Sequence, residues 1–216
     1  VVRVPNFLTV ANQVNLFQLG IEKAIVVLVM AFVIISGEID LSVASMMGLS
    51  AAVVAALFEQ GVPLPVAILV ALSVGAGFGL INGYFVAVVG LSSLAVTLAG
   101  YVGFRGLARL LVQDRSVGDF PGWFTSLGQQ GVIGPITLSI LVFAVLAVVA
   151  TVVLHFSGLG RLTYVVGSSA PVARFFGVSV ARTKMTIFLA SGLISALAGV
   201  LMAARLGAVR ASTAEG

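Results

Sequence analysis

The chain has 216 residues, of which 60% are hydrophobic and only 8% are charged, with a formal net charge of +4 and a mean hydropathy of +1.23. Soluble domains carry about 25% charged residues, so this composition excludes a soluble enzyme, and its hydrophobicity excludes a disordered chain. The sequence has no cysteine, which excludes disulfide bonds and cysteine-based metal sites. The composition predicts an all-α membrane protein with several spanning helices.

Six apolar segments are each long enough to cross a membrane, since a spanning helix needs roughly 20 apolar residues. The predicted helices comprise residues 16–36, 41–58, 66–89, 94–111, 136–156 and 185–206. We expect residues 1–216 to form a single transmembrane domain. Because the chain begins with Val1 and stops abruptly at Gly216, we also expect it to be a fragment of a longer protein.

Two carboxylates, Glu38 and Asp40, interrupt the apolar sequence between the first two predicted helices. Asp40 is expected to be the N-cap of the second helix and to accept hydrogen bonds from its first turn. Charges are costly within a bilayer, so both carboxylates are also functional candidates. Together with Ser42 and, in the third helix, Asn82, they would either line a path across the membrane or pin the broken segment. Asn82 is alternatively predicted to hydrogen-bond to a neighbouring helix.

Small residues recur at every fourth position in the third and sixth predicted helices. This spacing gathers them on one helical face, where they let a neighbouring helix approach closely. We predict that these faces pack against other helices and do not bind a ligand. They comprise Gly75, Gly79 and Gly83 and, in the last helix, Ser191, Ser195, Gly199 and Ala203.

The polar, glycine-rich residues 113–135 predict a loop at the membrane surface, anchored by Trp123 and the phenylalanines on either side of it. The adjacent charges Glu22 and Lys23 are expected at the same surface. His155, the single histidine, lies at a helix end with no acidic residue near it in sequence to complete a metal site. We therefore predict neither a metal site nor a cofactor.

Residues 157–184 carry several basic side chains and no acidic one, which predicts that this segment lies on the cytoplasmic side of the membrane. This segment contains Arg161, Arg174, Arg182 and Lys184 and neither Asp nor Glu. Alternation of the helices then places the carboxylates of the first break in the cytoplasm. The polar loop after the fourth helix and the N-terminus would face outward.

Within this segment, residues 167–177 predict a short helix whose two ends are marked. A serine can cap its start, Pro171 is tolerated in the first turn, and Gly177 suits the left-handed position after the helix. Two turns cannot bury Phe175 and Phe176, so we expect a protein partner or the membrane surface to cover them. The candidate contact comprises Gly167, Ser168, Pro171, Val172, Ala173, Arg174, Phe175, Phe176 and Gly177.

Four motifs, in order along the chain, resemble those of ribose/xylose/rhamnose-type permeases, the membrane subunits of bacterial ATP-binding-cassette sugar importers. The first is Ser36-Gly37-Glu38-Ile39-Asp40-Leu41-Ser42-Val43-Ala44-Ser45, which is similar to the family signature Gly-Gly-Ile-Asp-Leu-Ser-Val-Gly-Ser. The other three lie within residues 94–108, 160–178 and 191–201. Glu38 stands where the family commonly has glycine, which adds a charge to the break. Autoinducer-2 importer permeases share the resemblance.

This resemblance implies a bundle of transmembrane helices, some of them broken, in the bacterial inner membrane. It implies one permease domain that forms the path for uptake of a monosaccharide such as ribose, xylose or rhamnose by alternating access. The helix at 167–177 would be the coupling helix on the ATPase. The implied partners are cytoplasmic ATPase subunits, a second permease copy or a paralogue, and a periplasmic or lipid-anchored sugar-binding protein.

The sequence contains no Gly-x-x-x-x-Gly-Lys-Ser/Thr motif, so ATP hydrolysis is expected in a partner and the chain is not predicted to be an enzyme. A branched-chain amino acid, nucleoside or autoinducer-2 permease of the same superfamily remains an alternative. A stand-alone secondary transporter is a further alternative, but it would need ionisable relay residues within its helices. No run of basic residues indicates nucleic-acid binding.

Overall fold

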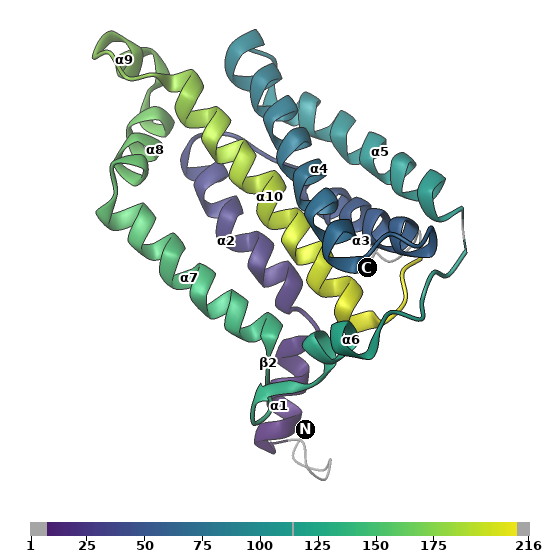
Figure 1. The fold of residues 1–216 in the computed structure, drawn as a ribbon. Coiled ribbons are helices and arrows are strands. Elements are labelled where there is room, and N and C mark those ends of the chain that lie inside the picture. The colour runs from purple at the N-terminus through teal and green to yellow at the C-terminus, as the bar shows by residue number, and fades with distance from the viewer. Residues whose placement is uncertain (1–7, 114, 211–216) are drawn as a thin grey trace.

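The computed structural model describes residues 8–113 and 115–210 and consists almost entirely of helices (Figure 1), which confirms the all-α prediction. Val1 and Gly216, on which the expectation of a longer protein rests, lie outside the described residues. The elements are α1 (Val10–Gln18), α2 (Ile21–Ile35), α3 (Val43–Glu59), α4 (Leu64–Tyr84), the π-helix η1 (Phe85–Val89), α5 (Ser93–Val112), α6 (Gly122–Gln129), the antiparallel strands β1 (Gly131–Ile133) and β2 (Ile136–Thr137), α7 (Leu138–Phe156), α8 (Gly158–Ser168), α9 (Ala170–Phe175) and α10 (Val180–Leu206).

The first two of the six predicted spanning segments differ from the helices in the structure. The first segment is bent by 54° between α1 and α2. Among the described residues, four helices are long and apolar enough to cross a membrane, or five if the bent pair counts as one span. The second segment is wrong as a full span, because residues 38–42 belong to no helix and α3 has only 17 residues.

Helix α10 lies in the middle of the bundle (Figure 1), and α10 and α3 are the helices with the most buried residues. Helix α10 packs against α2, α3, α4 and α6, whereas α3 also packs against α4 and α5. Helix α7 touches α2 and α8 and buries only Ser139 among its described side chains. A helix that is apolar all round and exposed in this way is suited to a lipid environment.

Small residues bring the central helices into backbone contact. Gly75 and Gly79 of α4 face Gly192 of α10, and a Cβ carbon built at Gly79 would lie 3.2 Å from the Cα of Gly192. Gly199 of α10 faces the backbone carbonyl of Met47 in α3. Gly192, outside the predicted stripe, is therefore a central packing position. The remaining residues of the two stripes are also buried: Gly83, Ser191, Ser195 and Ala203.

Residues 113–135 are more than a surface loop, since they include α6 and the first strand of a hairpin. Phe120 and Phe124 are only 7% and 2% exposed, whereas Trp123 is 50% exposed. The ring of Phe120 lies 5.3 Å from that of Phe58 between centroids. The predicted anchor is thus wrong for the two phenylalanines, because they fill the space between α6 and the end of α3.

Glu22, predicted at the outer membrane surface, is buried within the protein. Its side chain is 3% exposed, and one carboxylate oxygen lies 2.7 Å from Nε of Arg205 in α10. The backbone carbonyl of Arg205 in turn accepts a 3.0 Å hydrogen bond from Gln129 of α6. A carboxylate so far from water needs a cation as partner, which the sequence places 183 residues away. Lys23, its neighbour, is exposed as expected.

Residues 157–184 were expected to be a break between helices, but α8, α9 and the first turn of α10 occupy most of them. Val166, Ala173 and Val180, one from each of these helices, pack together in a small buried cluster. Ala173 is 1% exposed. It is therefore part of the core of this unit and cannot belong to an exposed contact surface.

Candidate functional site

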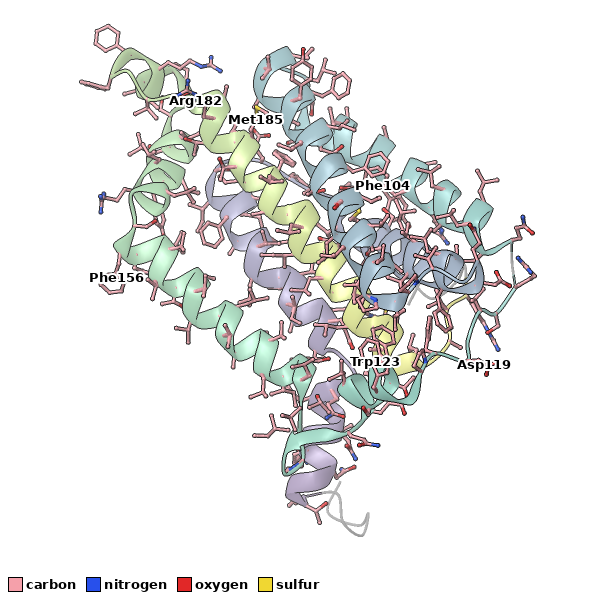
Figure 2. All side chains as sticks on the ribbon, in the orientation of Figure 1. Phe104, Asp119, Trp123, Phe156, Arg182 and Met185 are labelled. Atoms are coloured by element: carbon pink, nitrogen blue, oxygen red, sulfur yellow. The ribbon has the colours of Figure 1, made fainter. Side chains whose placement is uncertain are left out.

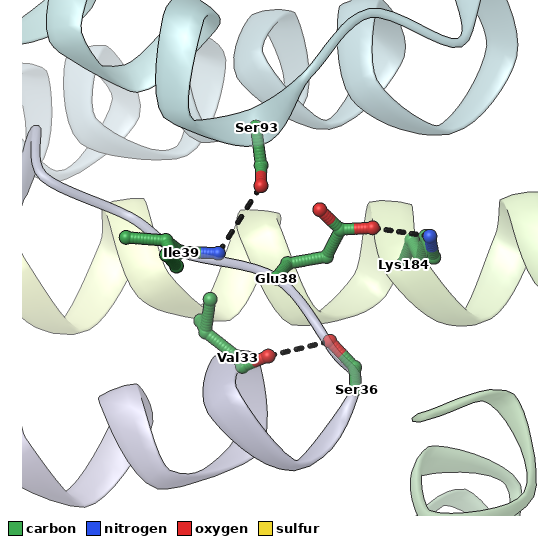
Figure 3. Close-up of polar contacts among 6 residues, drawn as sticks. All are labelled: Val33, Ser36, Glu38, Ile39, Ser93 and Lys184. Carbon is green, nitrogen blue, oxygen red and sulfur yellow. Dashed lines mark hydrogen bonds and ion pairs between the residues drawn. The ribbon is translucent and has the colours of Figure 1, made fainter. Parts of the chain in front are cut away.

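Among the described residues, several buried polar groups from different helices meet at the break at residues 36–42. Helix α2 ends because Gly37 adopts φ +82°, a left-handed conformation that glycine tolerates without a Cβ clash. The backbone N–H of Glu38 then donates to the carbonyl of Val33 at 3.1 Å, which completes the helix end. Ser36 also donates to Val33, through its hydroxyl at 2.7 Å (Figure 3).

The Asp40 carboxylate is 3% exposed and is held by hydroxyl and backbone donors. Its Oδ1 accepts from the backbone N–H of Ser42 at 2.9 Å and from the Ser42 hydroxyl at 2.6 Å. Its Oδ2 accepts from the hydroxyl of Ser191 in α10 at 2.7 Å. The expected N-cap role is wrong by two residues, because Ser42 occupies that position and makes no side-chain capping bond. Ser191, predicted to be a packing residue, is a hydrogen-bond donor to this carboxylate.

Glu38 forms an ion pair with Lys184 of α10 (Figure 3). The two side chains are 13% and 15% exposed, so Glu38 does not stand free in water at the mouth of the bundle. The next residue, Ile39, is fixed through its backbone: its N–H donates to the Ser93 hydroxyl at 3.2 Å, and its carbonyl accepts from the Thr97 hydroxyl at 3.3 Å. Both hydroxyls belong to α5, so the break is tied to α10 and α5 together.

A groove of about 460 Å³ opens between α4, η1 and α5, beside this break. Asn82 lines it and is 5% exposed, and its amide donates to the Ser42 hydroxyl at 3.0 Å. Phe78, Phe85 and Phe104 contribute aromatic walls. The prediction that Asn82 bonds to a neighbouring part of the bundle is confirmed, although its partner lies in the break just before α3 and not in a helix. Of the four candidate path residues, Asn82 lines the groove, while Glu38, Asp40 and Ser42 tie the break to its neighbours.

The four sequence motifs converge on this break. The second motif supplies Thr97, the fourth supplies Ser191, and the third supplies Gly167, which lies so close to the carbonyl of Ile35 that no side chain fits between them. The sequence did not identify Lys184 as a partner of Glu38. The signal was available, because both residues were predicted on the same side of the membrane with opposite charges.

Helix α9 stands at one end of the molecule, beyond the first turn of α10 (Figure 1). Its N-cap is Ser169, whose hydroxyl accepts from the backbone N–H of Val172 at 3.4 Å, and Gly177 follows its end with φ +79°. Phe175 and Phe176 are 86% and 76% exposed. Figure 2 places Arg182 near α9 and Trp123 at the opposite end of the bundle. The capped helix thus presents two aromatic rings that nothing in the described chain covers.

Comparisons with known proteins identify the family of the chain. A family described as "Branched-chain amino acid transport system / permease component" matches residues 12–215. The chain belongs to this family. Among curated relatives, the autoinducer 2 import system permease protein LsrD of Salmonella typhimurium is 34% identical and that of Escherichia coli O9:H4 is 35% identical, each over 192 residues.

The alignments cover 86% of this permease chain but 58% of each of these relatives, so the chain spans well under two thirds of their length. No solved structure matches it. Family membership and the four to five apolar helices confirm the predicted location, a bacterial inner membrane that the chain crosses several times.

His155, with Nδ1 3.0 Å from the carbonyl of Thr151, is exposed at the end of α7. Within the described ranges, no group of three or more metal-ligating side chains is present.

Proposed function

We propose that this permease forms the membrane path of an ATP-binding-cassette importer and binds the importer's ATPase through α9. The exposed pair Phe175 and Phe176 carries this proposal. Burying a phenylalanine side chain stabilises a complex by roughly 1.5–3 kcal/mol. Helix α9 has six residues and is capped at its start, so it holds the exposed rings in place before a partner binds. A groove on a protein partner would supply that burial.

The membrane surface is the alternative cover for α9. Arg174 in α9 and the nearby Arg182 are exposed and would suit either lipid phosphates or carboxylates on a protein. Family membership favours the protein partner, because a permease component of a transport system works with further subunits. The chain itself has no phosphate-binding loop, so ATP hydrolysis would take place in that partner.

The groove between α4, η1 and α5 is the proposed surface for the transported solute. Asn82 offers it a polar group within aromatic walls, a combination typical of small-molecule sites. Glu38, Asp40 and Ser42 fix the break beside the groove through their contacts to α10 and α4. In this proposal they act as the pin of the broken segment, and Asn82 lines the path.

A monosaccharide or autoinducer 2 is the proposed cargo. The Asp40-Leu41-Ser42-Val43 signature supports a sugar, and the names of the relatives support autoinducer 2. Branched-chain amino acids, named in the family description, and nucleosides are the competing cargoes. Secondary transport by this chain alone is disfavoured, because Glu22, Glu38 and Asp40 each already have a partner within the chain and hold the helices or the break in place.

We further propose one permease domain that pairs with a second copy or a paralogue, with α9 in the cytoplasm and a binding protein on the outer side. Two ion pairs support the predicted alternation of the helices across the membrane. Glu38 meets Lys184 at one end of the bundle, and Glu22 meets Arg205 at the other, as the predicted sides require.

The coupling role of α9 can be tested by Phe175→Asp in the complete protein, expressed with its ATPase. A carboxylate in a groove that excludes water would lack a partner, so copurification of the ATPase should fall at least about tenfold, equivalent to about 1.4 kcal/mol. The matched control is Phe156→Asp, since Phe156 is 78% exposed at the end of α7 and lies outside the proposed contact. Ala173→Asp is unsuitable as a test, because Ala173 is in the buried cluster.

The expected result is that both variants insert and elute as single species, while only Phe175→Asp loses the ATPase. If Phe175→Asp keeps the ATPase and the ATP hydrolysis that a loaded binding protein stimulates, α9 rests on the membrane surface and its coupling role is wrong.

A further inference from the structure

The first turn of α10 belongs to the same packed unit as α9. Val166 of α8, Ala173 of α9 and Val180 of α10 form one buried cluster. In the turn that follows α9, the N–H of Val178 donates back to the carbonyl of Ala173 at 3.0 Å. Because close-packed interiors deform little, a displacement of α9 is passed on to the start of α10.

Two polar side chains on α10 reach the break at residues 36–42 from one helical face. Lys184 lies one turn after the buried cluster, and Ser191 lies seven residues, or two turns, further along. Lys184 pairs with Glu38, and the Ser191 hydroxyl donates to Asp40 at 2.7 Å. Ser191 is fully buried, and both members of the ion pair are mostly buried. These contacts hold two residues of the break in register with α10.

The break is held on its other side by the walls of the groove. Ile39 bonds through its backbone to the hydroxyls of Ser93 and Thr97 in α5. The Ser42 hydroxyl accepts from Asn82 in α4, and Asn82 lines the groove. Residues 38–42 belong to no helix, so these side-chain contacts determine where the break lies. A shift of the break therefore reaches both α4 and α5.

We propose that Lys184 and Ser191 are positioning residues that carry a movement of α9 to the walls of the groove. The inference rests on the proposed function, because it requires an ATPase to act on α9. It adds the route by which that action would reach the solute path: from the α8–α9 unit to α10, from α10 to the break, and from the break to α4 and α5.

A purely structural role for the two residues is the competing explanation. Much of the contact between α10 and its neighbours is made by small residues in backbone contact, such as Gly192 and Gly199, and does not involve the ion pair. Replacing a mostly buried ion-pair member by an apolar residue changes stability in either direction. Transmission, in contrast, requires a contact that moves the break whenever α10 moves. A measurement at the groove separates the two explanations.

The groove can be monitored with a single cysteine, because residues 1–216 contain none and any cysteine elsewhere in the complete protein can be replaced by serine. Ala99 lines the groove and is exposed, so Ala99→Cys is the reporter. The reporter is introduced into the complete protein, assembled with its ATPase in phospholipid nanodiscs. The measured quantity is the rate of reaction with N-ethylmaleimide, first without nucleotide and then with the ATPase trapped by ATP and vanadate.

Lys184→Met and Ser191→Ala are the test variants, and Lys184→Arg is the conservative variant that keeps the charge. Arg115→Ala is the matched control, because it removes an ion pair with Glu59 whose side chains are 56% and 43% exposed and which involves no residue of α10. Copurification of the ATPase and the unfolding temperature are recorded for each protein. Ser191→Ala decides the question if Lys184→Met fails to fold.

In the unsubstituted reporter protein and in Arg115→Ala, we expect trapping to change the reaction rate about 5- to 150-fold, the usual range for coupled sites. In Lys184→Met and Ser191→Ala, the ratio should fall toward one while the ATPase still copurifies, and Lys184→Arg should restore it. Full nucleotide response in folded Lys184→Met and Ser191→Ala would overturn the inference. Absence of any response in the reporter protein itself would overturn the proposed function, and the inference with it.

Discussion

The contact between α10 and α3 at Gly199 leaves no room for a side chain, and its stability cost can be estimated. A Cβ carbon at this position would lie 2.9 Å from the carbonyl carbon of Met47 and closer still to the carbonyl oxygen, whereas ordinary van der Waals contact begins at 3.4 Å. In Gly199→Ala the two helices must therefore separate by at least about 0.5 Å. Overpacking of this kind costs about 1–3 kcal/mol.

Gly103 provides the matched control for this substitution. It lies in the exposed part of α5, and a Cβ carbon there would meet nothing within 4 Å. Gly103→Ala should stabilise its helix by about 0.5–1 kcal/mol, because glycine has more backbone freedom to lose on folding. The same glycine-to-alanine change is thus expected to act with opposite signs at the two sites.

Thermal unfolding of the purified complete protein in detergent, followed by size-exclusion chromatography after heating, measures both effects. With about 2–4 °C per kcal/mol for a chain of this size, Gly199→Ala should lower the midpoint by about 2–12 °C. Gly199→Leu should prevent assembly, because three carbon atoms beyond the Cβ have to enter the same contact. If Gly199→Ala unfolds at or above the midpoint of Gly103→Ala, the backbone contact between α10 and α3 is not as close as described.

Three further substitutions, two of them with a control variant, test other parts of the structure. Glu22→Gln should destabilise the protein by about 1–3 kcal/mol, because it leaves a mostly buried arginine on α10 without its counter-charge. The control Lys23→Gln, at the exposed neighbouring residue, should change the stability by no more than about 0.5 kcal/mol. Equal unfolding midpoints for the two variants would contradict the buried pair. Ser169→Cys should react with a membrane-impermeant maleimide in inside-out vesicles and not in spheroplasts, and labelling of spheroplasts would reverse the proposed topology. Gly167→Ala should lower the yield of folded protein, since its Cβ would overlap the carbonyl that ends α2, while Gly158→Ala, with nothing within 4 Å, should not; full yield of both would show that α8 can shift away from α2.

The sequence determined the parts of this protein that depend on local patterns. Apolar runs of membrane-spanning length located four of the six predicted helices closely, including α7 and α10. The serine before α9 and Gly177 after it mark its ends, because capping depends on residues within one turn of the chain. The four motifs pointed to the permease family that the comparisons confirm.

The partners of the buried polar groups were decided by the tertiary structure alone. The position of Asp40 in the sequence predicted a helix cap, yet its Oδ2 accepts a hydrogen bond from Ser191, which is 151 residues away. Glu22 suggested a surface residue, yet Arg205 neutralises it in the interior. A sequence pattern records how residues are spaced along one helix but not which face of another helix they meet. In a low-dielectric bundle a buried charge has to find its partner across that interface, so the packing of α10 against α2 and α3 determines which groups pair.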